Sequence, residues 1–420
     1  MSAPQPLTNW AGNIAFATRK RLAPTSIDEL REVVASSPRI RAVGTAHSFN
    51  DIADTDATQV SVVQIPSSVV VDAERQTATV SGGMRYGDVA SRLLQHGFAF
   101  HNLGSLPHIS IAGSCATGTH GSGARNRCLA GAVRALEMVT ANGDLVTLAR
   151  GVDADFNGAV VALGCLGVVT TMTLDVLPAF DMRQFVFDDM PADSVVNHFD
   201  EIVENAYSVS LFTTWRSHDV DQVWVKQRMS DDDAAPNPRW LGASLAESAR
   251  HPLPGMPVEN CTQQLGEPGP SHERLPHFRL EFTPSAGEEL QTEYLLPRER
   301  AVDAFEALAA IADQIAPVLQ VSEIRTIAAD EFWLSPAFGR DSVAFHFTWV
   351  KDDAAVRPVL SAVEERLAPF DPRPHWGKLF GVKPDDVAAR YAKLPQFREL
   401  AHRYDPSGKF RNAFVDPYLG

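Results

Sequence analysis

HNLGSLPHISIAGSCATGTHGSG, residues 101–123, is the stretch of this chain that is most informative about its fold. Glycine lets a backbone approach a ligand closely, and successive N–H groups in glycine-rich turns form concave anion sites. A pyrophosphate is the natural occupant of such a site, although composition alone agrees equally well with a glycine-rich turn in a β core. The stretch is not the GxGxxG that joins a strand to a helix in nicotinamide-binding folds. Its glycines are Gly104, Gly113, Gly118, Gly121 and Gly123.

A second stretch, RAVGTAHSFN at 41–50, places His47 in a tight turn directly after three small residues. An isolated histidine in such a turn usually satisfies its own backbone through a hydrogen bond. Together with the glycine-rich segment, however, His47 predicts a residue that carries a cofactor. The two glycines of GCLGVV at 164–169 would let a second segment of backbone lie flat against a ring system.

Composition excludes several classes of partner. The 420 residues carry a net charge of −15, which repels phosphate backbones and anionic lipid, so we expect neither nucleic-acid nor membrane binding. A small neutral substrate is compatible with this charge. The N-terminus has no signal-peptide pattern, and the apolar stretch at 158–174 contains glycines and threonines that favour sheet and turns over a membrane span. We therefore expect a cytoplasmic protein.

The four cysteines, Cys115, Cys128, Cys165 and Cys261, have no CxxC spacing and predict reduced, buried thiols. The histidines His101, His108 and His120 fit no compact metal-ligand spacing, and no carboxylate cluster accompanies them. We expect no metal site.

The first 180 residues predict an α+β arrangement with antiparallel hairpins and no regular βαβ alternation. A helix is expected over 25–36, with Ser26 and Glu29 at capping-box spacing, and another over 86–97. Strands are expected at 39–43 and 59–65, and hairpins at 69–82 and 136–149, the latter turning at Asn142-Gly143.

From about residue 180 the pattern changes. Proline, glycine and charge over 230–277 predict long surface connections, and alternating stretches at 277–283, 289–296, 318–327 and 342–350 predict strands. Helical patterns at 297–316 and 354–368 favour two helices over an antiparallel sheet. A chain of this length is also expected to form two domains.

GTAHSFN (44–50) and GSLPHISIAGSCATGTHGSG (104–123) together resemble the flavin domain of the vanillyl-alcohol-oxidase superfamily, and within it the alditol (xylitol) oxidases. The likeness continues in collinear order through TNWAGNI (8–14), YSVSLFT (207–213), NCTQQLGEPGP (260–270), LPHFRLEFTPS (275–285), EIRT (323–326), HFTW (346–349) and PHWGK (374–378). It implies a two-part FAD-binding domain of the p-cresol methylhydroxylase type over 1–180. A substrate-binding domain of antiparallel sheet and helices would follow over 181–374, and a tail over 375–420 would return to the FAD domain or the interface.

The resemblance implies a covalent bond between His47 and the 8α-methyl carbon of FAD, which would raise the reduction potential and retain the cofactor. Ala46 stands where the family has glycine, and a positive φ there would strain the alanine. The other residues implied to contact FAD are Ala42, Val43, Gly44, Thr45, Ala46, Ser48, Ser105, Ser110, Gly113, Thr117, Gly118, Thr119, His120, Val168 and His375.

Residues two apart in a strand share a face, so Glu323 and Arg325 point the same way, as do His346 and Thr348. Pattern alone favours an ordinary solvated sheet face for these residues. The resemblance instead implies a polyol site in which hydroxyls bind Ser105, Glu323, Arg325, Thr348 and Lys378. Arg325 and Lys378 would activate the C1 hydroxyl and flavin N5 would take the hydride. We assign the proton acceptor to His346 from its position and chemistry.

The function implied by the resemblance is oxidation of alditols such as xylitol or sorbitol to the aldose, with O2 reduced to H2O2. Gly104 falls where the superfamily controls oxygen access, although a turn would also explain a glycine there. One alternative is a sugar-lactone or aldonolactone oxidoreductase on the same fold, against which Glu323-x-Arg325 and HFTW argue. A flavin-free carbohydrate-binding protein is an alternative of another class. Nothing in the sequence forces oligomerisation, so we expect a monomer.

Overall fold

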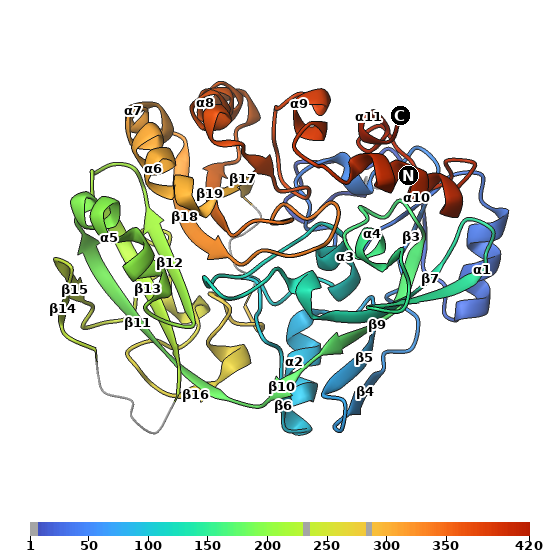
Figure 1. Ribbon diagram of the computed structural model, residues 1–420, viewed down its shortest axis with the longest axis horizontal. Helices are drawn as coiled ribbons and strands as arrows, with labels where there is room; N and C mark the ends of the chain where they lie inside the picture. Colours follow the sequence, from blue (N-terminus) through green and yellow to red (C-terminus); the bar gives the residue numbers. More distant parts are fainter. Residues whose placement is uncertain (1–6, 230–235, 283–287) are drawn as a thin grey trace, which may run out of the picture.

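A computed structural model describes residues 7–229, 236–282 and 288–420. Its first half contains two small sheets (Figure 1). One is parallel, in the order β1-β3-β2, and comprises β1 (Lys20–Leu22), β3 (Thr58–Val60) and β2 (Ile40–Ala42). The other is antiparallel, in the order β4-β5-β9-β7-β8, and comprises β4 (Val69–Asp72), β5 (Thr77–Ser81), β9 (Val168–Asp175), β7 (Val133–Val139) and β8 (Leu145–Ala149).

The antiparallel sheet confirms both predicted hairpins. The parallel pairing of β1, β3 and β2 was not predicted from the sequence. The parallel arrangement arises because α1 (Ile27–Ser36) crosses between β1 and β2 and buries Leu30 and Val34 in one cluster with Ile40 and Val60. The strand predicted at 59–65 is shorter than expected, since only its start pairs, within β3. The Ser26 side chain caps α1 as predicted by accepting from the Glu29 N–H.

The remaining helices of the first half are α2 (Tyr86–Gln95), α3 (Ile111–Ala116) and α4 (Phe156–Ala159). Gly97, just beyond α2, has φ +79°, which suits the predicted helix C-terminus. The short strands β6 (Phe98–Ala99) and β10 (Leu177–Pro178) pair with each other, and β10 leads into the second half. The apolar stretch at 158–174 begins at the end of α4 and continues as the predicted turns and sheet, the latter in β9.

The second half is built on a ten-stranded sheet among the described residues. Its order is β14-β15-β11-β13-β12-β18-β19-β17-β20, with β16 paired to β11. The central strands are β11 (Asp181–Met190), β13 (Val220–Arg228), β12 (Ser208–Thr213), β18 (Leu319–Ile327), β19 (Ser342–Val350) and β17 (Glu289–Pro297). The edge strands are β14 (Arg239–Trp240), β15 (Ala243–Leu245), β16 (Gly269–Pro270) and β20 (Arg373–Pro374).

Helices cover one face of this sheet. They are α5 (Ala192–Glu204), α6 (Ala301–Ala309), α7 (Ala312–Ile315) and α8 (Asp353–Leu367), which lie along the left and upper rim in Figure 1. Phe345, Phe347 and Trp349 of β19 pack into the core under these helices. The expectation of two helices was too low, because α5 also buries Val195, Phe199 and Ile202 in this core.

The strand predicted at 277–283 is wrong over the described residues 277–282, and residue 283 lies outside them. Apart from one isolated bridge at Phe278, this segment makes no ladder. The backbone N–H groups of His277 and Phe278 instead donate to the Ser105 carbonyl oxygen, at 3.1 and 3.3 Å. The alternating pattern therefore reflects packing between the two halves and not strand pairing.

The C-terminal segment returns to the first half through α9 (Pro384–Ala388), α10 (Leu394–Tyr404) and α11 (Asp416–Leu419). Trp376, Tyr391 and Phe397 belong to the same core cluster as the first-half strands. Arg41, buried in the middle of β2, donates to the carbonyl oxygens of Leu163 at 2.8 Å and Phe410 at 2.6 Å. The turn that follows β2 is thereby tied to the end of the chain.

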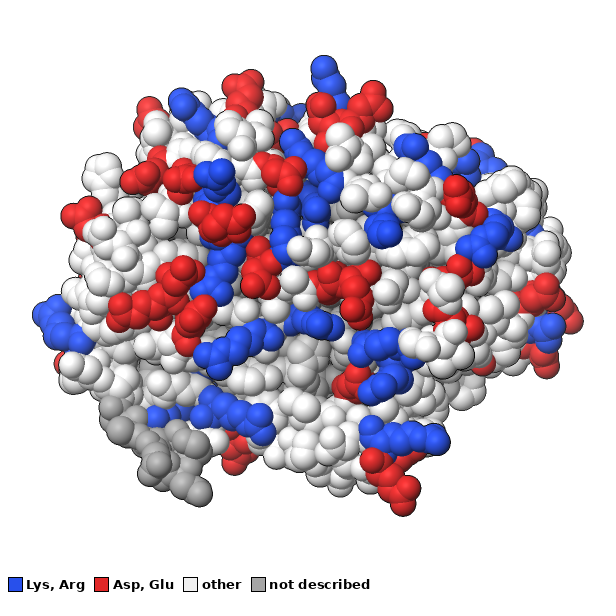
Figure 2. All heavy atoms as spheres, viewed as in Figure 1, with Lys and Arg blue, Asp and Glu red and all other residues white. Residues whose placement is uncertain are grey.

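Charges of both signs are mixed on the face drawn in Figure 2, with no extended basic surface there. Within the described residues, no helix has the length and apolar character needed to cross a membrane. All four cysteines are buried and free, as predicted.

Candidate active site

A cavity of about 610 Å³ lies between the first half and the polar face of the large sheet. The predicted site residues come together along its wall, with the exception of Gly118. Gly118 has φ +69°, and a Cβ there would stand 2.9 Å from Cδ of Pro336. Its position therefore reflects backbone conformation and close packing behind the cavity. Residues of both halves contribute to the wall: Ala42, Val43, Gly44, Thr45, Ala46, His47, Ser48, Gly104, Ser105, Ser110, Gly113, Thr117, Thr119, His120, Val168, Glu323, Arg325, His346, Thr348, His375 and Lys378.

The turn after β2 and the glycine-rich segment meet as bare backbone. The Ser110 N–H donates to Oγ1 of Thr45 at 3.1 Å, which joins the two segments. A Cβ on Gly44 would lie 2.2 Å from Oγ of Ser110, and one on Gly113 would lie 2.8 Å from the same atom. The two glycines therefore let the Ser110 hydroxyl lie close against both segments, and their backbone carries no side chain where it lines the cavity. This cradle fits the pyrophosphate of a dinucleotide.

Ala46 has φ +56°, so the alanine does adopt the left-handed conformation that favours glycine. Its carbonyl accepts from the Trp10 N–H at 2.8 Å, which holds the turn in place. The Trp10 ring stacks on His47, with ring centroids 5.1 Å apart and an interplanar angle of 19°. Trp10 was not among the predicted site residues, although TNWAGNI was among the segments that carry the resemblance.

His47 is held as a neutral imidazole. Burial lowers its pKa to about 4, and its Nδ1 is buried without a hydrogen-bond partner. A neutral imidazole with an unused nitrogen in a cavity wall is a competent nucleophile. The backbone cradle and this unused nitrogen fit a bound flavin dinucleotide.

Three ionisable side chains form one row across neighbouring strands of the sheet. His346 of β19 pairs in register with Glu293 of β17 on one side and with Glu323 of β18 on the other. Arg325 lies on the same face as Glu323, with its Nε 3.6 Å from Oε2 of Glu323. The predicted strand faces are confirmed, because the aromatic residues of β19 lie on the opposite side.

Glu293 connects the two cations of the site. Its Oε1 lies 2.6 Å from Nη2 of Arg325, and its Oε2 lies 2.7 Å from Nζ of Lys378. Burial opposes ionisation, but Lys378 and Arg325 hold the pKa of Glu293 well below its usual range. Glu293 was not predicted as a site residue, although the alternation of the 289–296 strand places it on one face with Glu289 and Gln291.

His346 is also neutral. Burial first, and then Lys378, hold its pKa well below the usual range. Both ring nitrogens are buried without hydrogen-bond partners. His375, in contrast, accepts from the Gly377 N–H through Nδ1 at 3.1 Å, so its neutral ring carries the proton on Nε2. Of these two histidines, His346 has the free lone pair that a proton acceptor needs.

Two further predictions for the site concern the surroundings of Gly104 and metal binding. A Cβ on Gly104 would meet only ordinary contacts, the nearest being Cδ1 of Ile109 at 3.6 Å. Its φ is not in the left-handed range, so a turn does not require glycine at this position. Within the described ranges, no group of histidine, cysteine or carboxylate side chains has an arrangement that would hold a metal.

Comparison with known proteins gives relatives over the whole chain. An alditol oxidase from Streptomyces sp. is 52% identical over 98% of this chain and 99% of its own length. An L-gulono-1,4-lactone dehydrogenase from Mycobacterium tuberculosis is 28% identical over 98% of this chain and 99% of its own. Two family models also match: an FAD binding domain over residues 19–149 and D-arabinono-1,4-lactone oxidase over 287–418.

Among solved structures, cholesterol oxidase from B. sterolicum superimposes with a TM-score of 0.78. The match covers 99% of this chain and 97% of the other at 14% sequence identity. It shows that the two chains share a fold of mixed helix and sheet.

Replacing Ala46 with glycine is expected to stabilise the protein. An L-residue in the left-handed region costs roughly 1–2 kcal/mol, and the added freedom of glycine in the unfolded chain offsets part of that gain. We predict that the free energy of unfolding of Ala46→Gly exceeds that of the wild type by up to about 1 kcal/mol in denaturant titration. Ala42→Gly, in the extended strand β2, is the control and should destabilise. Equal losses in both variants would contradict the strain at Ala46.

Proposed function

The chain belongs to the alditol oxidase family of FAD-dependent enzymes, and on that premise we propose that it oxidises the terminal C1 hydroxyl of an alditol such as xylitol or sorbitol to the aldose, with O2 reduced to H2O2. The observation that carries this proposal is the buried group of Glu293, Arg325, Lys378 and the neutral His346 in the wall of the same cavity as the backbone cradle. Such a group suits an uncharged substrate that becomes an anion as it reacts.

FAD would be held by the cradle of residues 42–48, by the glycine-rich segment, and by a covalent bond to His47. When bound, FAD supplies the acceptor for the hydride of the C1–H bond, and O2 then takes up the two electrons as H2O2. The stacked ring of Trp10 restricts the rotation of His47, and the Ala46 carbonyl that accepts from Trp10 keeps the turn closed beneath it. Val168 and His375 would complete the contacts on the other side of the cavity.

A chain of hydroxyls needs donors and acceptors in alternation, and the proposed substrate residues supply both. Arg325 and Lys378 donate, Glu323 accepts, and Ser105 and Thr348 do either. Glu323, Arg325 and Thr348 are buried, so a substrate analogue that lacks one hydroxyl would leave one of these polar groups without a hydrogen-bond partner. Such an analogue should therefore bind poorly.

Activation of the C1 hydroxyl is assigned to the two cations and to one histidine. Arg325 and Lys378, fixed by Glu293, would stabilise the alkoxide character of the oxygen as its O–H bond breaks. His346 would take that proton on one of its unpartnered nitrogens, while the electron pair of the C1–H bond leaves with the hydride. Burial keeps His346 in the unprotonated form that this role requires.

Oxygen access is assigned to Gly104. The space beside it tolerates a Cβ, so the glycine is not needed for packing or for a left-handed turn. An open path to the flavin is what a reaction with O2 requires, and a side chain at this position would narrow it.

The lactone oxidoreductases remain the second candidate, because a lactone-oxidase family model matches residues 287–418. The lactone dehydrogenase relative is 28% identical, against 52% for the alditol oxidase. A flavin-free binding protein agrees poorly with the matched FAD-binding domain. The division of the chain after residues 180 and 374, a monomeric state and a cytoplasmic location stay predictions from the sequence.

The substrate class is tested by steady-state assays of the purified holoenzyme in air. We predict that xylitol or sorbitol produces H2O2, with kcat/KM at least about 100-fold above that for L-gulono-1,4-lactone. The ring oxygen and carbonyl of the lactone cannot supply the hydroxyl groups that the site binds. The upper end of the expected ratio is roughly 10⁴-fold, the discrimination reached by sites that hydrogen-bond a substrate hydroxyl. Turnover of the lactone with no response to any alditol would instead establish the second candidate.

The covalent bond is tested by acid precipitation. We predict that flavin stays in the washed pellet of the wild type and is lost from that of His47→Ala, because only the tether survives unfolding. His96→Ala, at an exposed helix end, is the control and should retain the flavin. Flavin that washes out of the wild-type pellet would exclude the tether.

A further inference from the structure

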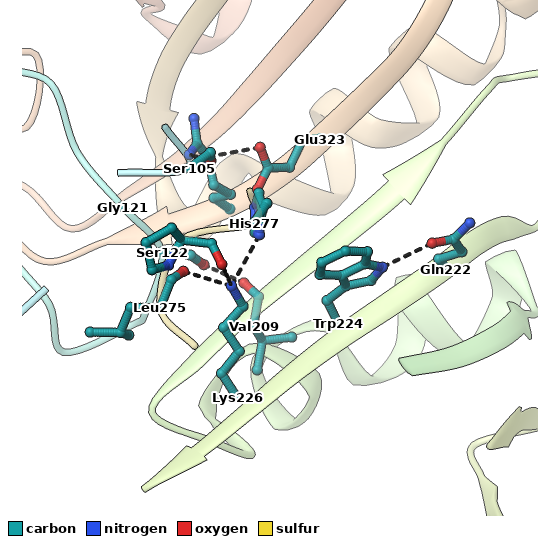
Figure 3. A network of polar contacts seen from close by, with 12 residues as sticks. Ser105, Gly121, Ser122, Val209, Gln222, Trp224, Lys226, Leu275, His277 and Glu323 are labelled. Atoms are coloured by element: carbon teal, nitrogen blue, oxygen red, sulfur yellow. Dashed lines mark hydrogen bonds and ion pairs between the residues drawn. The ribbon is translucent and has the colours of Figure 1, made fainter. Parts of the chain in front are cut away.

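A buried lysine that the proposed chemistry does not use lies behind the substrate wall. Lys226 of β13 is 1% exposed and contacts three acceptors through its Nζ: the carbonyl oxygens of Leu275 at 2.6 Å and Pro276 at 3.0 Å, and Nδ1 of His277 at 3.1 Å. His277 in turn lies between Lys226 and Glu323, with its Nε2 2.7 Å from Oε1 of Glu323 (Figure 3).

The positions of the protons follow from counting donors. Glu323 is a carboxylate, because Arg325 and His277 lower its pKa against the effect of burial. It can only accept, so Nε2 of His277 donates to it. Burial lowers the pKa of His277 to about 4, so the neutral ring has a lone pair on Nδ1. Lys226 must therefore donate to three acceptors, which only the ammonium form does. Burial lowers the pKa of Lys226 to about 7, and the Glu323 charge opposes this shift.

This arrangement leaves Glu323 with one occupied and one available oxygen. Oε1 accepts from His277, whereas Oε2 lies 3.6 Å from Nε of Arg325, and the side chain lines the cavity. The backbone N–H of His277 also donates to the Ser105 carbonyl at 3.1 Å. The same histidine therefore touches two of the proposed substrate residues, which come from opposite sides of the cavity.

We propose that Lys226 and His277 are positioning residues that fix Glu323 as an acceptor aimed into the cavity, and that they make this end of the site specific for a substrate hydroxyl. The inference rests on the proposed function. Lys226 sets the tautomer of His277, and His277 sets the rotamer and the free oxygen of Glu323. A hydroxyl group donates to that free oxygen, whereas an ether or carbonyl oxygen placed there meets a buried carboxylate without a proton between them.

Two substitutions of His277 separate this role from simple packing. The amide nitrogen of His277→Gln reaches the place of Nε2 and keeps the donor to Glu323, whereas His277→Asn reaches only the place of Nδ1 and keeps the contact with Lys226. We predict that KM for xylitol rises at least 10-fold in His277→Asn and less than 3-fold in His277→Gln, with kcat within 3-fold of wild type in both. A substrate contact that is equal in the ground and transition states changes KM alone.

Lys226→Met is the second variant and should raise KM in the same direction, because His277 loses the donor that sets its tautomer. Flavin content and thermal midpoint are measured for all three variants to identify any that fold poorly. If the wild type oxidises xylitol but His277→Asn and His277→Gln have equal KM values, this inference is overturned and the proposed function stands. A wild type inactive toward every alditol would overturn the proposed function and this inference with it.

Discussion

The site depends on one buried carboxylate, that of Glu293. Arg325 comes from β18 and Lys378 from the returning C-terminal segment, and without a counter-charge the two cations would repel each other in a poorly solvated interior. Glu293 contacts both at hydrogen-bond distance. Arg325 also lies 3.6 Å from Oε2 of Glu323, so carboxylates on two neighbouring strands hold this cation. Both cations line the cavity wall, where they would stabilise an alkoxide oxygen.

The fold produces this chemistry by separating the two faces of one sheet. Along β19 the odd-numbered aromatic residues pack under the helices, and the even-numbered His346 and Thr348 face the cavity. Because neighbouring strands are in register, the period of two places polar side chains of β17, β18 and β19 in one row. The first half contributes the opposite wall, in which the backbone of Gly44 and Gly113 lies against the Ser110 hydroxyl. Two walls of different chemistry therefore enclose one cavity.

Sequence reasoning succeeded where a local pattern determines the structure. The strands at 289–296, 318–327 and 342–350 alternate clearly, and this alternation assigned the faces of Glu323, Arg325, His346 and Thr348. It failed where partners are distant. The strands β11, β12 and β13 and the helix α5 were not predicted, and the pattern at 277–282 was misread because its contacts are to the Ser105 loop. The alternation of the 289–296 strand shows which face Glu293 shares, but its pairing with Arg325 and Lys378 depends on distant segments. The contacts of His277 and Lys226 likewise form across the fold.

The most direct measurement of the central claim is the anaerobic rate at which xylitol bleaches the flavin of Glu293→Gln. A neutral amide cannot balance two cations, so Arg325 and Lys378 should lose the geometry that we propose activates the C1 hydroxyl. We predict a bleaching rate about 100-fold below that of the wild type, with the flavin still attached. Glu288→Gln, at an exposed carboxylate near the start of the same strand, should bleach at the wild-type rate. A wild-type rate in Glu293→Gln would contradict the account.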